Sequence, residues 1–213
     1  MRSSGELGRF IAFLRKYSRP KFGPAPAFDS LDLVRAFWTV CKRQPISRQE
    51  LSSTLELGEG SVRSAIRALA SAGLVEVRKR GCIPARRGRA LFGQLACVVS
   101  RVSPVRASAI TFGERAVGAV VAGGASKVRM GLEERDAALR AGASGATVLV
   151  RKGKLHLTGS FDDRNFITPD VEKEIESVLS PCEGDAVILS YSPRKPGAER
   201  GAWGAVLALM ERL

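Results

Sequence analysis

The sequence predicts an α+β protein with a helical N-terminal domain that ends in a short β-hairpin, followed by a C-terminal two-layer α/β sandwich. Charge supports this division, because residues 1–103 contain 19 Lys and Arg against 7 Asp and Glu, whereas residues 104–213 contain 15 against 14. The predicted elements also change, from helices followed by two short strands to strands alternating with helices. We therefore expect an arm at 1–28 and domains at 29–103 and 104–213.

In the N-terminal arm, we expect a short helix that ends before the prolines between Pro20 and Pro26. Apolar side chains from Leu7 to Leu14 crowd one side of it, and Arg9, Arg15 and Lys16 take the other. The helix either lies on phosphates through its basic side or docks onto the body through its phenylalanines. We favour docking, because aromatic clusters are costly to leave in water.

The core of the N-terminal domain begins with a helix capped by Asp29 or Ser30 and running to about Arg43. A second helix starts at Ser47, which with Glu50 forms a capping-box pattern. Glycines at 58 and 60 interrupt that helix. A third helix follows at roughly Ser61–Ala72, and Gly73 ends it.

The third helix and the segment after it carry most of the candidate binding residues. Val62, Ile66 and Leu69 form the buried face of the helix, which leaves its serines and arginines outward. Val75 and Val77 then alternate with polar residues, as in a half-buried strand. The strand ends at Gly81, Cys82–Pro84 returns, and another helix opens near Arg86. The outward and basic residues of this region are Ser61, Arg63, Ser64, Arg67, Arg78, Lys79, Arg80, Arg86 and Arg87.

This order of helix, helix, strand, turn and strand resembles the winged helix-turn-helix of transcription regulators over residues 29–102. The run AL…AGLVEVR followed by GRAL is its most specific part. The resemblance implies that Arg63, Ser64 and Arg67 read base edges of double-stranded DNA, while basic residues around the wing hold phosphates. Winged helices also bind RNA or protein; the strong positive charge favours DNA.

A helix is predicted after the hairpin, from about Arg87 to Val102. Its Leu91, Leu95, Val98 and Val102 are spaced by four, three and four residues, which is a seam pattern. The resemblance implies a homodimer contact along this seam, whereas packing within the helix's own domain is the equally weighted alternative.

The C-terminal domain is expected to follow a boundary at Ser103–Ser108, which contains Pro104. A two-layer sandwich with helices on one sheet face suits the pattern, in a ferredoxin-like order, and a strand at Ala107–Thr111 would make a ββαββα order equally possible. The predicted strands are Ala116–Val121, Ala146–Val150, Lys154–Thr158 and Ala186–Tyr191, and the helices are Leu132–Ala141, Asp170–Leu179 and Gly201–Leu213.

Glycine-rich turns suggest a small-molecule effector site in this domain. Gly123–Lys127 combines glycine amides, a hydroxyl and a cation that suit an anion, although a plain turn is the favoured interpretation. The turn at 142–145 follows a charged helix start, and we expect the two turns to share a cavity. The candidate effector-binding residues are Ser126, Lys127, Arg129, Arg135 and Asp136.

Catalytic and metal-binding motifs are missing from the sequence. His156 alternates with apolar neighbours on a strand and has no nucleophile or carboxylate at a useful spacing. The four cysteines show no paired spacing and are interpreted as core residues or free thiols. We expect neither enzyme activity, cofactor nor metal. Since no signal peptide or apolar run of about 20 residues occurs, we expect a soluble, cytoplasmic protein.

The whole chain also resembles uncharacterised archaeal winged-helix proteins that carry a C-terminal α+β domain of unknown function. The residues behind this resemblance are AGLVEVR, GRAL and GLEERDAALRAGASGATVLV at 131–150. The expected function is a DNA-binding transcription regulator with a ligand-sensing or dimerisation domain. The alternatives are an enzyme acting on a small phosphorylated metabolite with an accessory winged helix, and an RNA- or protein-binding adaptor.

Overall fold

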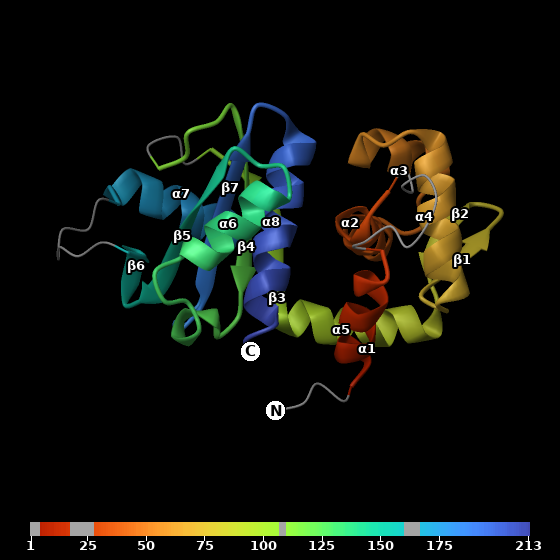
Figure 1. The fold of residues 1–213 in the computed structure, drawn as a ribbon, viewed down its shortest axis with the longest axis horizontal. Helices are drawn as coiled ribbons and strands as arrows, with labels where there is room; N and C mark the ends of the chain where they lie inside the picture. The colour runs from red at the N-terminus through yellow and green to blue at the C-terminus, as the bar shows by residue number, and fades with distance from the viewer. Residues whose placement is uncertain (1–4, 18–27, 107–109, 160–166) are drawn as a thin grey trace. The chain divides into compact units, whose positions relative to one another are not determined.

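The computed structural model describes residues 5–17, 28–106, 110–159 and 167–213, and Figure 1 shows their helices and strands. The chain divides into two compact units, Met1–Leu95 and Ala96–Leu213. This division precedes the boundary expected at Ser103–Ser108, because β3 (Val99–Val105) pairs with a strand of the second unit. The possible strand at Ala107–Thr111 lies largely outside the described residues.

The first unit consists of short helices and one antiparallel hairpin (Figure 1). The helices are α1 (Glu6–Arg15), α2 (Ser30–Lys42), α3 (Arg48–Leu55), α4 (Glu59–Ser71) and α5 (Arg86–Val98), and the hairpin strands are β1 (Val75–Arg78) and β2 (Gly81–Pro84). The starts of α2 and α3 follow from their side-chain caps. The Asp29 carboxylate accepts from the backbone N–H groups of Leu31 and Asp32, and the predicted reciprocal capping box of Ser47 and Glu50 is confirmed.

Helix α1 docks on α2 through its aromatic side, as favoured from the sequence. Phe10 and Leu14 are buried, and the ring centroids of Phe10 and Phe37 lie 5.3 Å apart. Arg35 of α2 is also buried; its guanidinium donates to the Asp32 carboxylate at 3.2 Å and to the carbonyl of Leu55 at 3.0 Å. These bonds compensate the burial of its charge and tie α2 to the end of α3.

The hairpin is attached to the start of α3 by backbone hydrogen bonds between Ile46 and Cys82, at 2.7 and 3.1 Å. Gly73, with a φ of 68°, ends α4 in the left-handed conformation as predicted. The expectation that β1 is half-buried is wrong at Val77, which is 56% exposed while Val75 is buried. The outer half of the hairpin extends beyond the core, so its apolar residue has no surface to pack on.

The second unit is built on a five-stranded sheet in which every neighbouring pair is antiparallel. The strands lie in the order β3-β4-β7-β5-β6, so that β3 and β6 form the two edges. They are β3, β4 (Arg115–Val121), β5 (Gly145–Lys152), β6 (Lys154–Leu157) and β7 (Ala186–Ser192), and the helices are α6 (Leu132–Arg140), α7 (Pro169–Leu179) and α8 (Lys195–Met210), with a short 3-10 turn at Gly124–Ser126.

Helices cover both faces of this sheet, so the two-layer prediction is wrong (Figure 1). On one face of the sheet, Leu179 of α7 occupies the space that a side chain at Gly118 of β4 would need. On the other face, Gly201 of α8 lies directly against Ser190 of β7. Strands β4 and β7 are apolar on both sides, which is the pattern of a sheet buried in three layers. The ferredoxin-like order is also wrong, because it would pair β4 with β6 at the centre of the sheet, whereas β4 pairs with β3 and β7 and β6 lies at an edge.

Two predicted helices differ from the observed ones by more than two residues at one end or both. The helix after the hairpin ends at Val98 rather than Val102, because the β-branched residues that follow form edge strand β3. Helix α8 begins at Lys195, six residues before the predicted Gly201, with Pro196 in its first turn where proline is tolerated. In the described part of the chain, none of the helices has the length and apolar character needed to cross a membrane.

Candidate nucleic-acid interface

A basic groove of about 380 Å³ lies in the first unit between the starts of α3 and α4 and the hairpin. Its lining brings together the predicted residues Arg63, Arg78, Lys79 and Arg80 with Arg48, which the sequence analysis had not singled out. Glu59 is the acidic residue of the lining. The groove therefore collects five cations against one carboxylate, an arrangement suited to a polyanion.

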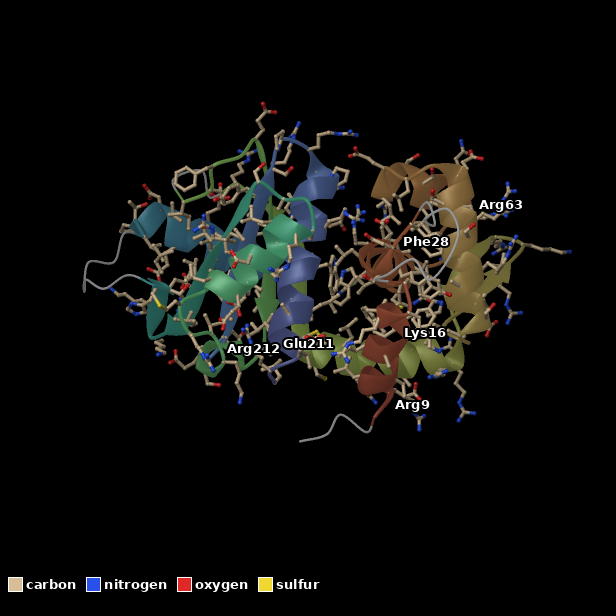
Figure 2. All side chains as sticks on the ribbon, viewed as in Figure 1. Arg9, Lys16, Phe28, Arg63, Glu211 and Arg212 are labelled. Carbon is tan, nitrogen blue, oxygen red and sulfur yellow. The ribbon has the colours of Figure 1, made fainter. Side chains whose placement is uncertain are left out.

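Helix α4 presents the predicted polar residues on its outer face. Arg63, Ser64 and Arg67 are exposed and Ser61 is half-buried, while Val62, Ala65, Ile66 and Leu69 form the buried face. Figure 2 shows Arg63 projecting from α4 toward solvent. Of the outward residues of α4 predicted from the sequence, only Arg63 lines the groove.

The hairpin supplies cations that differ in their availability. The Arg78 guanidinium donates to the Glu76 carboxylate, with its Nε at 2.9 Å, so part of its charge is neutralised. Lys79 and Arg80 are exposed at the turn and make no hydrogen bond or ion pair within the described residues. These two side chains are free to bind an external anion.

The two arginines at the start of α5 have different roles. Arg86 is exposed, as expected of a phosphate contact. Arg87 instead donates to the Glu6 carboxylate at 2.7 Å and to the carbonyl of Ala72 at 3.0 Å, which ties α1 and the end of α4 to α5. The Arg87 guanidinium is the main reason that the pKa of Glu6 lies below its usual value of 4.5. Arg87 is thus engaged within the fold.

The start of α3 contributes to the groove in a way that the sequence analysis missed. The capping box satisfies the N–H groups of Ser47 and Glu50, but those of Arg48 and Gln49 have no intrahelical acceptor. Ser47, Arg48 and Gln49 all line the groove. The N-terminal end of a helix attracts phosphate through these N–H groups and its dipole. The capping box in the sequence marks this helix start, so it was the signal that could have identified these N–H groups as a phosphate site.

The predicted effector turns of the second unit do not share a cavity. Gly123 follows β4 and Gly142 precedes β5; since both strands are antiparallel to β7, they run in the same direction and the turns lie at opposite ends of the sheet. The Gly123 amide also already donates to the buried Asp185 carboxylate at 3.0 Å. This turn is therefore capped from within the fold.

The remaining candidate effector residues are exposed on the surface of the second unit. Ser126, Lys127 and Arg129 follow β4, and Arg135 and Asp136 lie on α6; all are exposed. Their neighbour Glu134 is instead fully buried and ion-paired with Arg212, which also contacts Glu133 at 3.1 Å. The pairing of Glu134 with Arg212 was not predicted, because Arg212 is distant in sequence.

All four cysteines are free thiols, as expected. Cys41 and Cys82 are buried, and burial raises the pKa of Cys41 to about 12 and also raises that of Cys82. Exposed His156 donates from Nε2 to the carbonyl of Lys152 at 3.1 Å. Within the described ranges, no three His, Cys, Asp or Glu residues are grouped so that they can hold a metal ion.

These features define an α+β protein with an N-terminal helical unit that carries a small hairpin, and a C-terminal antiparallel sheet with helices. Residues 112–209 match a family described as "Domain of unknown function (DUF4443)". No curated protein matches the chain significantly. Among solved structures, the chain is similar to hypothetical protein PH0730 from the archaeon Pyrococcus horikoshii OT3, with 23% identity and a TM-score of 0.68, covering 87% of this chain and 100% of that one. At this identity the likeness shows the fold.

Proposed function

We propose that the first unit is a winged helix that binds double-stranded DNA, and that the protein is a transcription regulator. The observation that carries this proposal is the groove between α3, α4 and the hairpin, which gathers five cations and one carboxylate. In a winged helix, α4 is the recognition helix and the β1–β2 hairpin is the wing. The order of α2, α3, α4, β1 and β2 supports this assignment.

Sequence reading is assigned to the outer face of α4. Arg63, Ser64 and Arg67 are exposed on a helix whose other face is buried, so the helix can enter the major groove without unfolding. An arginine that bonds both acceptors of a guanine contributes about 1–3 kcal/mol of discrimination between bases.

Phosphate binding is assigned to the residues on either side of that helix. Lys79 and Arg80 have no partner in the described part of the chain and extend from the tip of the wing. Arg48 and the free amides at the start of α3 face the same groove. Contacts to phosphate are independent of sequence and release counterions, so they make binding depend steeply on salt.

The second unit is proposed to serve in dimerisation or regulation. A homodimer remains our proposal, but the predicted seam is not its interface, because Leu91 and Leu95 are fully buried within a single chain and Val102 lies on β3. Dimeric regulators bind operators with two-fold symmetry.

Fluorescence anisotropy of the full chain tests DNA binding. A labelled duplex selected from a random pool is titrated at several salt concentrations, with the wild type and with Arg63→Ala, Lys79→Ala and Arg129→Ala. Arg63→Ala is expected to lose about 1–3 kcal/mol on the selected duplex and little on random DNA. Lys79→Ala should weaken both duplexes alike and reduce the salt slope by about one.

Arg129→Ala is the matched control, since Arg129 is also an exposed cation but lies in the second unit. If it weakens binding as much as Lys79→Ala, the groove is not the site. Double-stranded and single-stranded RNA of the same sequence are titrated in parallel. Tighter binding to either RNA than to duplex DNA would favour an RNA-binding module instead.

A further inference from the structure

We propose that a second groove of the first unit, on the side of α1, binds a small amphipathic carboxylate: a molecule with an apolar body and one negative charge. The groove has a volume of about 460 Å³ and is formed by α1, the C-terminal end of α4 and the start of α5. This volume lies in the range of about 300–1,000 Å³ that is typical of small-molecule sites. It shares no lining residue with the proposed DNA groove.

The lining of the groove is largely apolar. On α1, Phe10, Phe13 and Tyr17 form a row of aromatic rings, with centroids 6.3 Å apart for the first pair and 5.4 Å for the second. Half-buried Ala68 and Ala72, at the C-terminal end of α4, contribute small apolar surface. Phe10 is already buried, but Phe13, Tyr17 and Ala68 are only half-buried, so an aromatic or aliphatic body that covers them removes apolar surface from water, which is favourable.

The rim of the groove carries more positive than negative charge. Arg9, Lys16 and Arg87 line it together with a single carboxylate, Glu6. Arg9 and Arg87 both bind Glu6, at 3.0 and 2.7 Å. Lys16 is exposed and makes no ion pair or hydrogen bond through its ammonium group within the described chain.

Three cations around one carboxylate leave an excess of two positive charges at the edge of an apolar surface. Figure 2 shows that Arg9 and Lys16 both extend from α1. A ligand whose carboxylate lies near Lys16 and whose body covers the aromatic row satisfies both the charge and the apolar lining. A nucleic acid or inorganic anion satisfies the charge alone, and a neutral lipid satisfies the apolar lining alone.

Three probes distinguish these possibilities in isothermal titration calorimetry with the full chain and no DNA. They are decanoate, decanol and inorganic phosphate. Decanoate and decanol are used below the concentrations at which they self-associate. Decanoate is expected to bind one site per chain. Decanol, which lacks the charge, should bind about tenfold more weakly, as expected for a lost charge-assisted contact. Equal binding of decanol, or tighter binding of phosphate than of decanoate, would overturn the proposal.

Variants then locate the site. Lys16→Glu should weaken decanoate about tenfold and leave decanol unchanged. Ala68→Phe fills the groove from α4 and should weaken both probes. Lys173→Glu, the same charge change at an exposed position of α7, is the matched control and should alter neither.

Thermal denaturation first establishes that each variant is folded. If Ala68→Phe does not fold, Lys16→Glu still tests the site, because Lys16 is exposed and its substitution should leave the fold intact. Decanoate binding that is unaffected by Lys16→Glu, or that Lys173→Glu weakens equally, would show that the anion binds elsewhere. Because the assay contains no DNA, its outcome is independent of the proposed DNA binding.

Discussion

Gly88 of α5 lies against the carbonyl group of Leu74, so closely that a Cβ placed on Gly88 would fall 1.9 Å from the Leu74 oxygen. The atom it would strike belongs to the backbone, which cannot move aside as a flexible side chain does. The contact joins the start of α5 to the residue that precedes β1. Only glycine therefore fits at this position, although glycine destabilises the interior of a helix relative to alanine.

Gly88→Ala is expected to destabilise the protein severely or to abolish folding of the first unit, because either α5 or the hairpin must shift. Gly93→Ala is the control, since Gly93 lies on the same helix with nothing within 4 Å of its Cβ position. That substitution should raise stability by about 0.5–1 kcal/mol. Urea denaturation followed by circular dichroism measures both. Equal effects of the two substitutions would contradict this account of the α5–hairpin contact.

The Glu6–Arg87 ion pair predicts a pH dependence of α1 docking. Since the pKa of Glu6 is lowered in the folded protein, its contribution to stability is present above the usual carboxyl value of 4.5 and is lost as the pH falls through the lowered value. Glu6→Gln should therefore reduce the melting temperature near neutral pH, and the difference from the wild type should shrink in acid. A difference that grows as the pH falls would mean that the pair does not stabilise the fold.

The buried carboxylate of Glu134 depends on Arg212 for compensation of its charge. Arg212→Ala leaves a buried anion without its cation and should cost about 3 kcal/mol of unfolding free energy. Arg135→Ala, which removes an exposed cation from the same helix, should change stability little. Adding Glu134→Gln to Arg212→Ala should restore part of the loss. If the double variant is no more stable than Arg212→Ala, charge burial is not the cause.

Local signals explain what the sequence predicted correctly. The capping box of Ser47 and Glu50 and the left-handed Gly73 depend on a few neighbouring residues, and both occur as expected. The apolar spacing of Val62, Ile66 and Leu69 likewise identifies the buried face of α4, and therefore its exposed face. The main candidate residues for DNA binding follow from these short-range patterns.

Long-range contacts explain what the sequence did not predict. Strand β3 follows α5 without a break, and the apolar spacing from Leu91 to Val102 fits a continuous helix. The strand forms because the residues after Val98 pair with β4, a contact that the spacing does not reveal. The engagement of Arg87 depends on Glu6, which is 81 residues away. The separation of the two glycine turns depends on strand order, which a linear pattern does not contain.

Pro104 on edge strand β3 affects how copies of the protein behave at high concentration. A proline offers no N–H group, so β3 presents an incomplete row of donors to any strand that approaches from outside. The opposite edge, β6, begins with exposed Lys154, whose charge repels a second copy of itself. Both open edges therefore disfavour sheet extension between chains, so the folded protein should resist fibrous aggregation even though its central strands are almost entirely apolar.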